Sequence, residues 1–218
     1  MCFSAAASFV TAGAVGAIGA AALSRVKDLR ELALAVTPVL FGLQQAIEGW
    51  QWLTLPLAPE SSTSTGLTVL YLFFAEVFWP LHAPIAVWLV EPSERRRQFM
   101  VVCLVVGVGV GSYLLLPLLT QPHSASIVEG HIVYVTENRH SEAVGLSYLT
   151  ATSLPLLLSS QRTLVVLGAV VLIGSGVAYL LYWEAFVSVW CFFAAAASMV
   201  ILHHFEQSRR ARMRLADA

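Results

Sequence analysis

Residues 98–120 read QFMVVCLVVGVGVGSYLLLPLLT, a run of 23 residues without a charged side chain. A helix needs about 20 predominantly apolar residues to cross a bilayer, so this run predicts a membrane-spanning helix. Outward from it in both directions, largely apolar stretches occupy 4–24, 32–55, 66–90, 144–160, 163–182 and 184–206. The sequence therefore predicts an all-α integral membrane protein, a bundle of seven transmembrane helices.

The composition leaves little material for a water-facing surface. Of 218 residues, 58% are hydrophobic and only 11% are charged, whereas an ordinary soluble domain has about 25% charged residues. One membrane domain, residues 1–207, is expected to account for almost the whole chain, with a short basic cytoplasmic tail at 208–218. The lipid bilayer is then the main partner of the protein.

The basic residues predict the orientation of the bundle. With seven spans and the N-terminus outside, the inner segments hold eleven arginines and lysines, and the outer segments hold only Arg139. Cytoplasmic loops carry such an excess, so the C-terminus is predicted to lie in the cytoplasm of a bacterial plasma (inner) membrane. Arg25 and Lys27 follow the first apolar run and do not precede it, which argues against a cleaved signal peptide.

Only one connection is long, and it lies on the predicted outer side. Residues 121–143 join the fourth span to the fifth and contain two β-prone runs on either side of Glu129-Gly130. Such runs about a short turn predict a small β-hairpin over the outer mouth of the bundle.

Small residues recur at helical spacing in two of the spans. Ala12, Gly16 and Ala20 lie in the first, and Gly107 and Gly111 lie in the fourth. Ridges of this kind let helix backbones approach closely. They predict tight packing between helices, and they could also form a homo-oligomer interface.

Polar side chains inside the predicted spans are the candidates for function, because an unpaired charge there costs at least ~2.5–3.5 kcal/mol. Gln44 and Glu48 share one face of the second span, four residues apart. Together with Glu76 they form a predicted outer polar layer, whereas His82 and His203 fall at similar depths in the inner part. Every lysine and arginine lies in a loop or tail, so both carboxylates must be protonated, meet a cation or face water.

Two prolines interrupt the third span beside these groups. Pro80 removes the hydrogen bond to the carbonyl of Glu76, and Pro84 removes the bond to the carbonyl of Pro80. A kinked, polar site is expected there, like the broken helices of transporters; a simple kink satisfied by water is the alternative.

Three segments of the chain resemble those of a known family. They are the opening Met1-Cys2-Phe3-Ser4-Ala5, the Gln44-Gln45-xx-Glu48-Gly49 segment, and Phe78-Trp79-Pro80-Leu81 followed by the basic 95–97 loop. The chain resembles an uncharacterised family of bacterial multi-pass membrane proteins that begin Met-Cys-Phe-Ser-Ala. The resemblance implies a shared fold and no established activity. It directs attention to Cys2, Glu48, Trp79-Pro80 and His82.

The leading hypothesis is an outward-opening intramembrane site that binds a divalent metal and could act as an enzyme on a small or lipid-soluble substrate. Glu48 and Glu76 are the candidate catalytic groups. The candidate metal ligands are Cys2, Glu48, Glu76, His82, His131 and His203. Removal of Met1 would give Cys2 a free amine beside its thiolate, and mixed thiolate, imidazole and carboxylate ligands suit zinc.

Three other functions remain open. A small transporter or channel for a cation or polar solute would use the kinked third span as its gate. A haem-binding electron carrier would use His82 and His203 as axial ligands, and a sensor or assembly protein would carry no chemistry. Retinal is excluded because the only lysine, Lys27, lies in a loop, and no basic, aromatic-studded surface indicates a nucleic acid.

Overall fold

A computed structural model describes residues 4–135, 141–181 and 197–216. The predictions for Cys2, Arg139 and the start of the last span at residue 184 lie outside these residues. Within them the chain is mostly helical. The helices are α1 (Ala5–Leu23), α2 (Leu32–Thr54), α3 (Ser62–Leu72), α4 (Trp79–Val90), α5 (Glu94–Thr120), α6 (Glu142–Leu157), α7 (Arg162–Leu181) and α9 (Ser198–Ala216).

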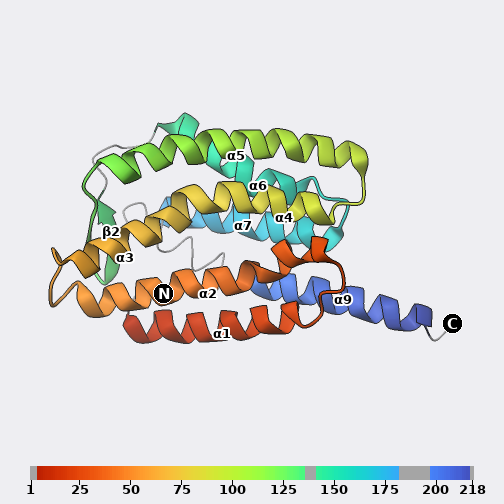
Figure 1. Cartoon of the computed structure of the whole chain (residues 1–218), viewed down its shortest axis with the longest axis horizontal. Coiled ribbons are helices and arrows are strands. Elements are labelled where there is room, and N and C mark those ends of the chain that lie inside the picture. The colour runs from red at the N-terminus through yellow and green to blue at the C-terminus, as the bar shows by residue number, and fades with distance from the viewer. Residues whose placement is uncertain (1–3, 136–140, 182–196, 217–218) are drawn as a thin grey trace.

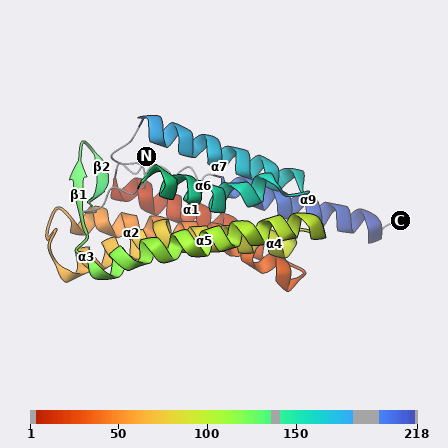
Figure 2. The same ribbon diagram turned by 90° about the horizontal axis from the view of Figure 1, so that it is seen from above.

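The long helices lie side by side along one axis and form a ring (Figures 1 and 2). Helix α1 packs on α2, α2 on α4, α4 on α5 and α6, and α6 on α7. Helix α9 contacts α7, α1 and α2 and so closes the ring. A short 3-10 turn, η1 (Leu29–Glu31), leads into α2, and a π-helical segment, η2 (Phe73–Phe78), joins α3 to α4.

Four of the described helical stretches are long and apolar enough to cross a membrane: Ala5–Leu23, Leu29–Thr54, Ser62–Val90 and Glu94–Thr120. They correspond to the first four predicted spans. The stretch that contains α2 is the most buried of the four, at 56% of its apolar window, against 22% for α1. Among these four stretches, the one with α2 therefore packs most extensively against the rest of the bundle.

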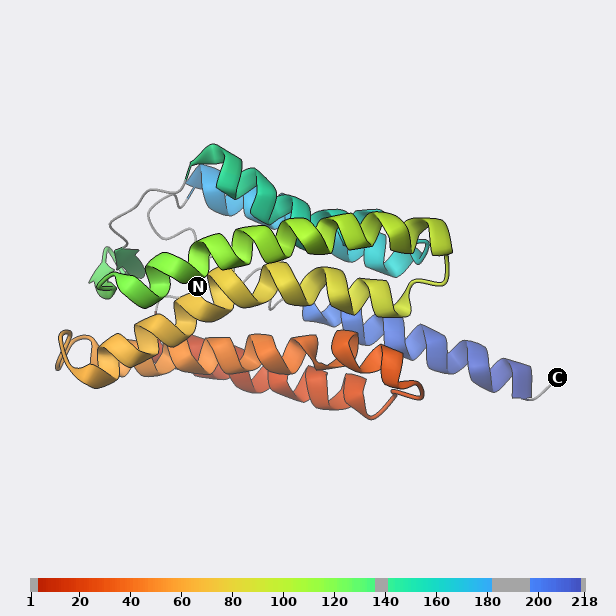
Figure 3. The same ribbon diagram turned by 45° about the horizontal axis from the view of Figure 1, so that its top comes forward.

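Helix α9 extends further than the sequence analysis expected. The predicted span ends at residue 206 and a separate tail begins at 208, but the helix continues without a break to Ala216 and projects beyond the bundle (Figure 3). Glu206 contacts Arg210 one turn later at 3.3 Å, a spacing that stabilises helices. The basic tail is thus the last turns of α9.

The predicted hairpin is confirmed. Strand β1 (Ser124–Val128) pairs antiparallel with β2 (His131–Val135), with Val128 opposite His131. Glu129 and Gly130 form the two-residue turn, and both have positive φ, as the tight turns of hairpins require. Ile132 and Ala125 pack on Leu55 beyond the end of α2, so the hairpin is held against the bundle.

The two predicted ridges of small residues are used for contacts within the chain. A Cβ added to Gly107 of α5 would lie 2.0 Å from the carbonyl oxygen of Pro80 in α4. A Cβ added to Gly42 of α2 would come within 3.0 Å of the carbonyl oxygen of Ala12 and 3.2 Å of the backbone nitrogen of Gly16 in α1. Glycine therefore permits both close approaches.

The two ends of the bundle differ in charge. All eleven described lysines and arginines lie in or beside the α1–α2, α4–α5 and α6–α7 connections, or at the C-terminal half of α9. We call this the basic end. The other end, with β1, β2 and the α2–α3 connection, is the hairpin end, and it carries Glu60, Glu129 and Glu142.

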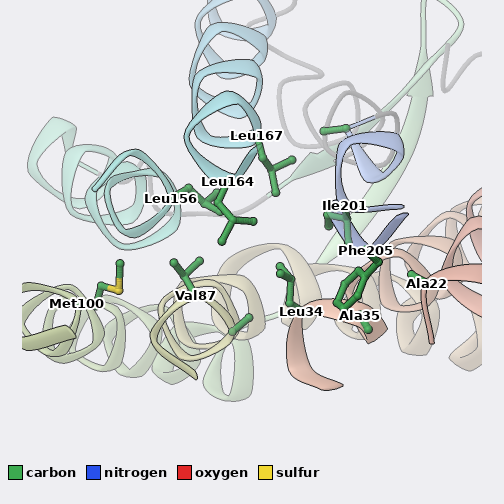
Figure 4. Close-up of a cluster of buried hydrophobic side chains, with 12 residues drawn as sticks. Ala22, Leu34, Ala35, Val87, Met100, Leu156, Leu164, Leu167, Ile201 and Phe205 are labelled. Carbon is green, nitrogen blue, oxygen red and sulfur yellow. The ribbon is translucent and has the colours of Figure 1, made fainter. Parts of the chain in front are cut away.

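An apolar cluster fills the bundle toward the basic end. Side chains from every described long helix from α1 to α9 except α3 meet there (Figure 4). Its fully buried members include Leu34 of α2, Leu164 of α7 and Phe205 of α9. This cluster leaves the polar interior groups of the bundle mainly on the hairpin side.

Candidate functional site

Helix α2 carries a strip of polar side chains in the interior of the bundle. Gln44, Gln45, Glu48 and Gln51 each have at most 1% of their surface exposed. Residues 44, 48 and 51 repeat at the spacing of one helical face, so three of these groups point into the same region. Buried polar groups are costly unless they are hydrogen-bonded, and the partners of this strip therefore define the site.

Trp79 is the partner of Gln44. Its indole nitrogen donates a hydrogen bond to Oε1 of Gln44 at 2.8 Å, and its ring stacks on Phe41 with centroids 4.0 Å apart. The bond fixes which residues of α2 and α4 lie at the same level along the bundle axis. The two helices run in opposite directions, so residues after Gln44 and residues before Trp79 lie on the same side of the bond. Glu48, one turn after Gln44, and Glu76, three residues before Trp79, both lie beyond it toward the hairpin end.

Glu48 is hydrogen-bonded to its own helix. Nε2 of Gln45 donates to Oε2 of Glu48 at 3.3 Å. Oε1 of Gln45 accepts no hydrogen bond within the described residues, and neither does the buried hydroxyl of Ser8 in α1. Gln45 lies between Gly42 and Gly49, whose faces contact α1, so both atoms belong to the α1–α2 interface.

Gln51 connects the strip to the hairpin. The hydroxyl of Tyr134 donates to Oε1 of Gln51 at 2.7 Å, and Nε2 of Gln51 donates to Thr68 at 3.2 Å. The ring of Tyr134 stacks on Tyr71 with centroids 4.6 Å apart. The sequence analysis missed both Tyr134 and Gln51. Two signals were present: the 44, 48, 51 spacing, and the alternation of Ile132 and Tyr134 in the second strand.

That same alternation separates His131 from the strip. Ile132 and Tyr134 face the bundle, so His131 and Val133 project from the other face of β2. Burial lowers the pKa of His131, and the nearby Glu129 carboxylate acts in the opposite direction. The hairpin residue that reaches the polar strip is therefore Tyr134, and His131 lies on the opposite face.

Glu76 lies in the π-helical segment η2, and it is half-buried. Here the backbone N–H of Trp79 donates to Phe74, five residues back. In this register Pro80, which has no N–H, leaves the carbonyl of Ala75 without a donor. The hydroxyl of Tyr148 in α6 donates to this oxygen at 2.5 Å. The sequence analysis assumed an α-helical register and assigned the missing bond to Glu76.

The hydrogen bond that Pro84 removes is the one predicted from the sequence. Helix α4 is α-helical at Pro84, so the carbonyl of Pro80 has no donor four residues later. The backbone of Gly107 covers this oxygen. Single-turn π segments inside helices are rare and occur often at functional sites, which makes the 73–84 region a candidate beyond its prolines.

His82 and His203 are not brought together. Nε2 of His82 lies 3.0 Å from the hydroxyl of Thr37, and both residues line a cavity of about 60 Å³ on the basic side of Trp79. His203 is exposed on α9 and lies 2.8 Å from the side-chain amide of Gln207. Ile201, not His203, is the α9 residue that lines the cavity.

No three His, Cys, Asp or Glu side chains in the described part of the chain are close enough to hold a metal by themselves. The described groups of the strip offer carboxylate and amide oxygens. Cys2, the expected thiolate ligand, lies outside the described residues.

The comparisons with known proteins agree with the resemblance drawn from the sequence. Neither a curated protein nor a solved structure matches the chain. The sequence profile of one family, described as a family of unknown function (DUF6629), matches residues 1–216. Because the match covers nearly all of its 218 residues, the chain belongs to the DUF6629 family.

Proposed function

We propose that the protein is a seven-span membrane protein of the bacterial plasma membrane, with its N-terminus outside and its C-terminus in the cytoplasm. The four stretches of membrane-crossing length would be joined by α6, α7 and a last span ending in α9. The gathering of eleven basic residues at one end supports this orientation, because cytoplasmic segments carry the excess of Lys and Arg. The hairpin end would then face outward.

A reporter and a labelling experiment test this topology. A C-terminal reporter should be active only on the cytoplasmic side. Val128→Cys, exposed on the hairpin, should react with a membrane-impermeant thiol reagent in intact cells, whereas Arg95→Cys at the basic end should react only after lysis. A periplasmic C-terminus would contradict the combination of seven spans and an outer N-terminus.

We further propose that the polar strip of α2 binds a divalent cation from the outer side. The observation that carries this proposal is a buried group of oxygen donors: Glu48, a carboxylate with 0% exposure, lies among three glutamines that are also buried. Burial disfavours the charged form of a carboxyl, and a cation bound beside it would favour that form. Oε1 of Gln45, which accepts no hydrogen bond from the part of the chain that the structure describes, is a further acceptor beside it.

The chemistry of these donors narrows the choice of metal. Carboxylate and amide oxygens suit Mg²⁺, Mn²⁺ or Ca²⁺. Zinc would need Cys2 or an imidazole in addition. Glu48 would be a direct ligand, and Glu76, on the same side of the Trp79–Gln44 bond, would be the second carboxylate. A bound cation with an open position would supply Lewis-acid activation of a water, and the site would then act as a hydrolase on a lipid-soluble substrate.

One observation favours transport of the cation as the second candidate function. Polar groups lie on both sides of the stacked Phe41 and Trp79: Glu48 on the hairpin side, and Thr37 with His82 at the cavity on the basic side. The π segment and two prolines allow α4 to change its packing at this level. Trp79 would then be the barrier between an outer and an inner polar compartment.

The test is bound metal per protein after purification in Mg²⁺, Mn²⁺ or Zn²⁺, measured with thermal stability. Glu48→Gln should lose the metal and keep the fold, because the amide is nearly isosteric but a far poorer cation ligand. Glu60→Gln is the matched control, an exposed carboxylate at the same end. Glu76→Gln and Cys2→Ser then tell whether the second ligand is an oxygen or a sulfur.

Three outcomes decide between the functions. Metal lost only in the ligand variants supports the site. Metal-free wild type, or full occupancy in Glu48→Gln and Glu76→Gln, contradicts it. Cation flux into liposomes that depends on Glu48 would favour the transporter over the enzyme.

A further inference from the structure

A second polar site lies at the opposite end of the molecule, in a cleft of about 480 Å³ between the end of α1 and the projecting part of α9. Its walls are Ser24, Arg25, Lys27, Arg209, Arg212 and Met213. Four of these six residues carry a positive charge. The volume lies in the range of small-ligand sites.

Ion pairs hold two of the cations in place. Nε of Arg25 lies 2.8 Å from Oε2 of Glu206, and Nη1 of Arg25 also donates to the carbonyl of Ala21. Nη1 of Arg212 lies 3.3 Å from Oε1 of Glu31, and its Nη2 donates to the carbonyl of Arg25 at 3.2 Å. These bonds join α1 and the α1–α2 connection to α9, so residues far apart in the sequence form the walls of the cleft.

The other two cations are not neutralised by these pairs. The ammonium of Lys27 has no acidic partner among the described residues. Arg209 lies 4.0 Å from Glu206 with about half of its side chain exposed, and Glu206 already accepts hydrogen bonds from Arg25 and Arg210. The cleft therefore has a surplus of positive charge that an anion would balance.

The position of the cleft indicates where that anion comes from. Ser24 directly follows α1, which is long and apolar enough to cross a membrane and ends at Leu23. The cleft is thus at the level where a spanning helix leaves the hydrocarbon. Met213, an exposed lining residue of the cleft, adds apolar surface beside the cations. Phosphates of lipid headgroups lie at this level, beside the first methylenes of their chains.

From these observations we propose that the cleft binds the phosphate headgroup of an anionic phospholipid. Arg25 and Arg212, fixed by their carboxylate partners, would shape the site, and Lys27 and Arg209 would supply the unbalanced charge. The lipid would join α1 to α9 at the basic end. This site is independent of the cation proposed for α2, because it requires only that α1 crosses the bilayer.

The experiment uses the full chain in detergent with added lipid. Thermal unfolding is followed with phosphatidylglycerol, with zwitterionic phosphatidylcholine, and with inorganic phosphate at the same concentration. Co-purified lipid is measured as phosphorus per protein. The test variant is Lys27→Gln with Arg209→Gln, two exposed side chains that take no part in the Arg25–Glu206 or Arg212–Glu31 pair. The matched control is Arg95→Gln with Arg162→Gln, which removes the same charge from the same end.

Phosphatidylglycerol should raise the melting temperature of the wild type and the control, and phosphatidylcholine should not. In Lys27→Gln with Arg209→Gln the affinity should fall about five-fold for each cation removed, because one cation near anionic lipid contributes about this factor. If that variant does not fold, Lys27→Gln alone should show about half of the loss on a logarithmic scale.

Other outcomes would overturn the proposal. An equal loss in the control would show a diffuse effect of surface charge and no site. An equal shift with phosphatidylcholine would show a preference for any lipid, and an equal shift with inorganic phosphate would assign the cleft to a soluble phosphate instead.

Discussion

The indole nitrogen of Trp79 lies 2.8 Å from Oε1 of Gln44, and this bond joins α4 to α2 in the interior of the bundle. It marks the boundary between two polar regions. Glu48 lies on the hairpin side of it, and the pair of Thr37 and His82 lies on the basic side. Both functions proposed for α2 depend on this boundary.

Trp79→Phe should destabilise the protein. It keeps an aromatic ring against Phe41 but removes the donor to Gln44, and a buried polar group that loses its partner costs about 1–3 kcal/mol. Thermal unfolding in detergent measures the effect. Trp50→Phe is the control, because Trp50 is 55% exposed on the same helix as Gln44. Equal melting temperatures for the two variants would mean that the bond contributes nothing.

Tyr134→Phe should loosen the hairpin. The change removes only the hydroxyl that donates to Gln51, at a cost of about 1 kcal/mol or more, since the acceptor stays buried. Hydrogen exchange of the amides in β1 and β2 should become faster. Tyr113→Phe removes a hydroxyl from an exposed tyrosine of α5 and should change neither exchange nor stability. Unchanged exchange in Tyr134→Phe would show that the hairpin is held by its apolar contacts alone.

Gly107→Ala and Gly109→Ala should have opposite effects although both glycines lie in α5. The new Cβ at position 107 would lie 2.0 Å from the carbonyl oxygen of Pro80, so α4 and α5 must separate, at a cost of about 1–3 kcal/mol or more. Position 109 has nothing within 4 Å, and alanine there should stabilise the helix by up to about 1 kcal/mol. A neutral Gly107→Ala would contradict the close packing of α4 on α5.

Glu91 should make stability depend on pH. It follows α4 outside the apolar span, where burial alone would raise its pKa. Hydrogen bonds from Ser160, Ser159 and Ser93 outweigh burial and hold the pKa below its ordinary value. Since the folded pKa is the lower one, the stabilisation is complete above the ordinary carboxyl pKa of about 4.3 and is lost as the pH falls through the folded pKa.

Comparison with Glu91→Gln measures this contribution. The variant should be less stable than wild type by about 1–3 kcal/mol near pH 7, because hydrogen bonds to a charged acceptor are lost. The difference should shrink as the pH falls below the ordinary carboxyl pKa of about 4.3, where the unfolded state takes up its proton, and should be lost once the folded carboxyl is protonated as well. Glu94→Gln, which changes an exposed carboxylate at the same end, is the matched control. A constant difference down to pH 3 would contradict the assignment.

The sequence was sufficient to predict features that depend on short segments of the chain, such as helix positions and the hairpin turn. Apolar runs near 20 residues long predicted the helices at 4–24, 32–55 and 98–120 to within a few residues of Ala5–Leu23, Leu32–Thr54 and Glu94–Thr120. The two β-prone runs on either side of Glu129-Gly130 predicted the hairpin, because strand preference and turn residues are local properties. The buried position of Glu48 also followed from its place within an apolar run.

Contacts between segments that are distant in the sequence could not be predicted from these local patterns. Whether His131 or Tyr134 reaches the strip depends on which face of β2 packs against Leu55, and a shift of one residue would exchange them. The depth argument paired His82 with His203, but depth says nothing about the direction in which a side chain leaves its helix. The structure turns His82 to Thr37 and His203 to Gln207.

The register of η2 shows the same division. Proline at positions 80 and 84 determined that two backbone donors would be missing, since this follows from covalent structure alone. Packing decided which carbonyls lose a backbone donor and which groups compensate. The π turn transfers one missing hydrogen bond to the carbonyl of Ala75, to which the hydroxyl of Tyr148 donates. The backbone of Gly107 covers the carbonyl of Pro80. Covalent constraints and hydrophobic lengths are local properties of a chain, whereas side-chain direction and register are set only when its helices pack together.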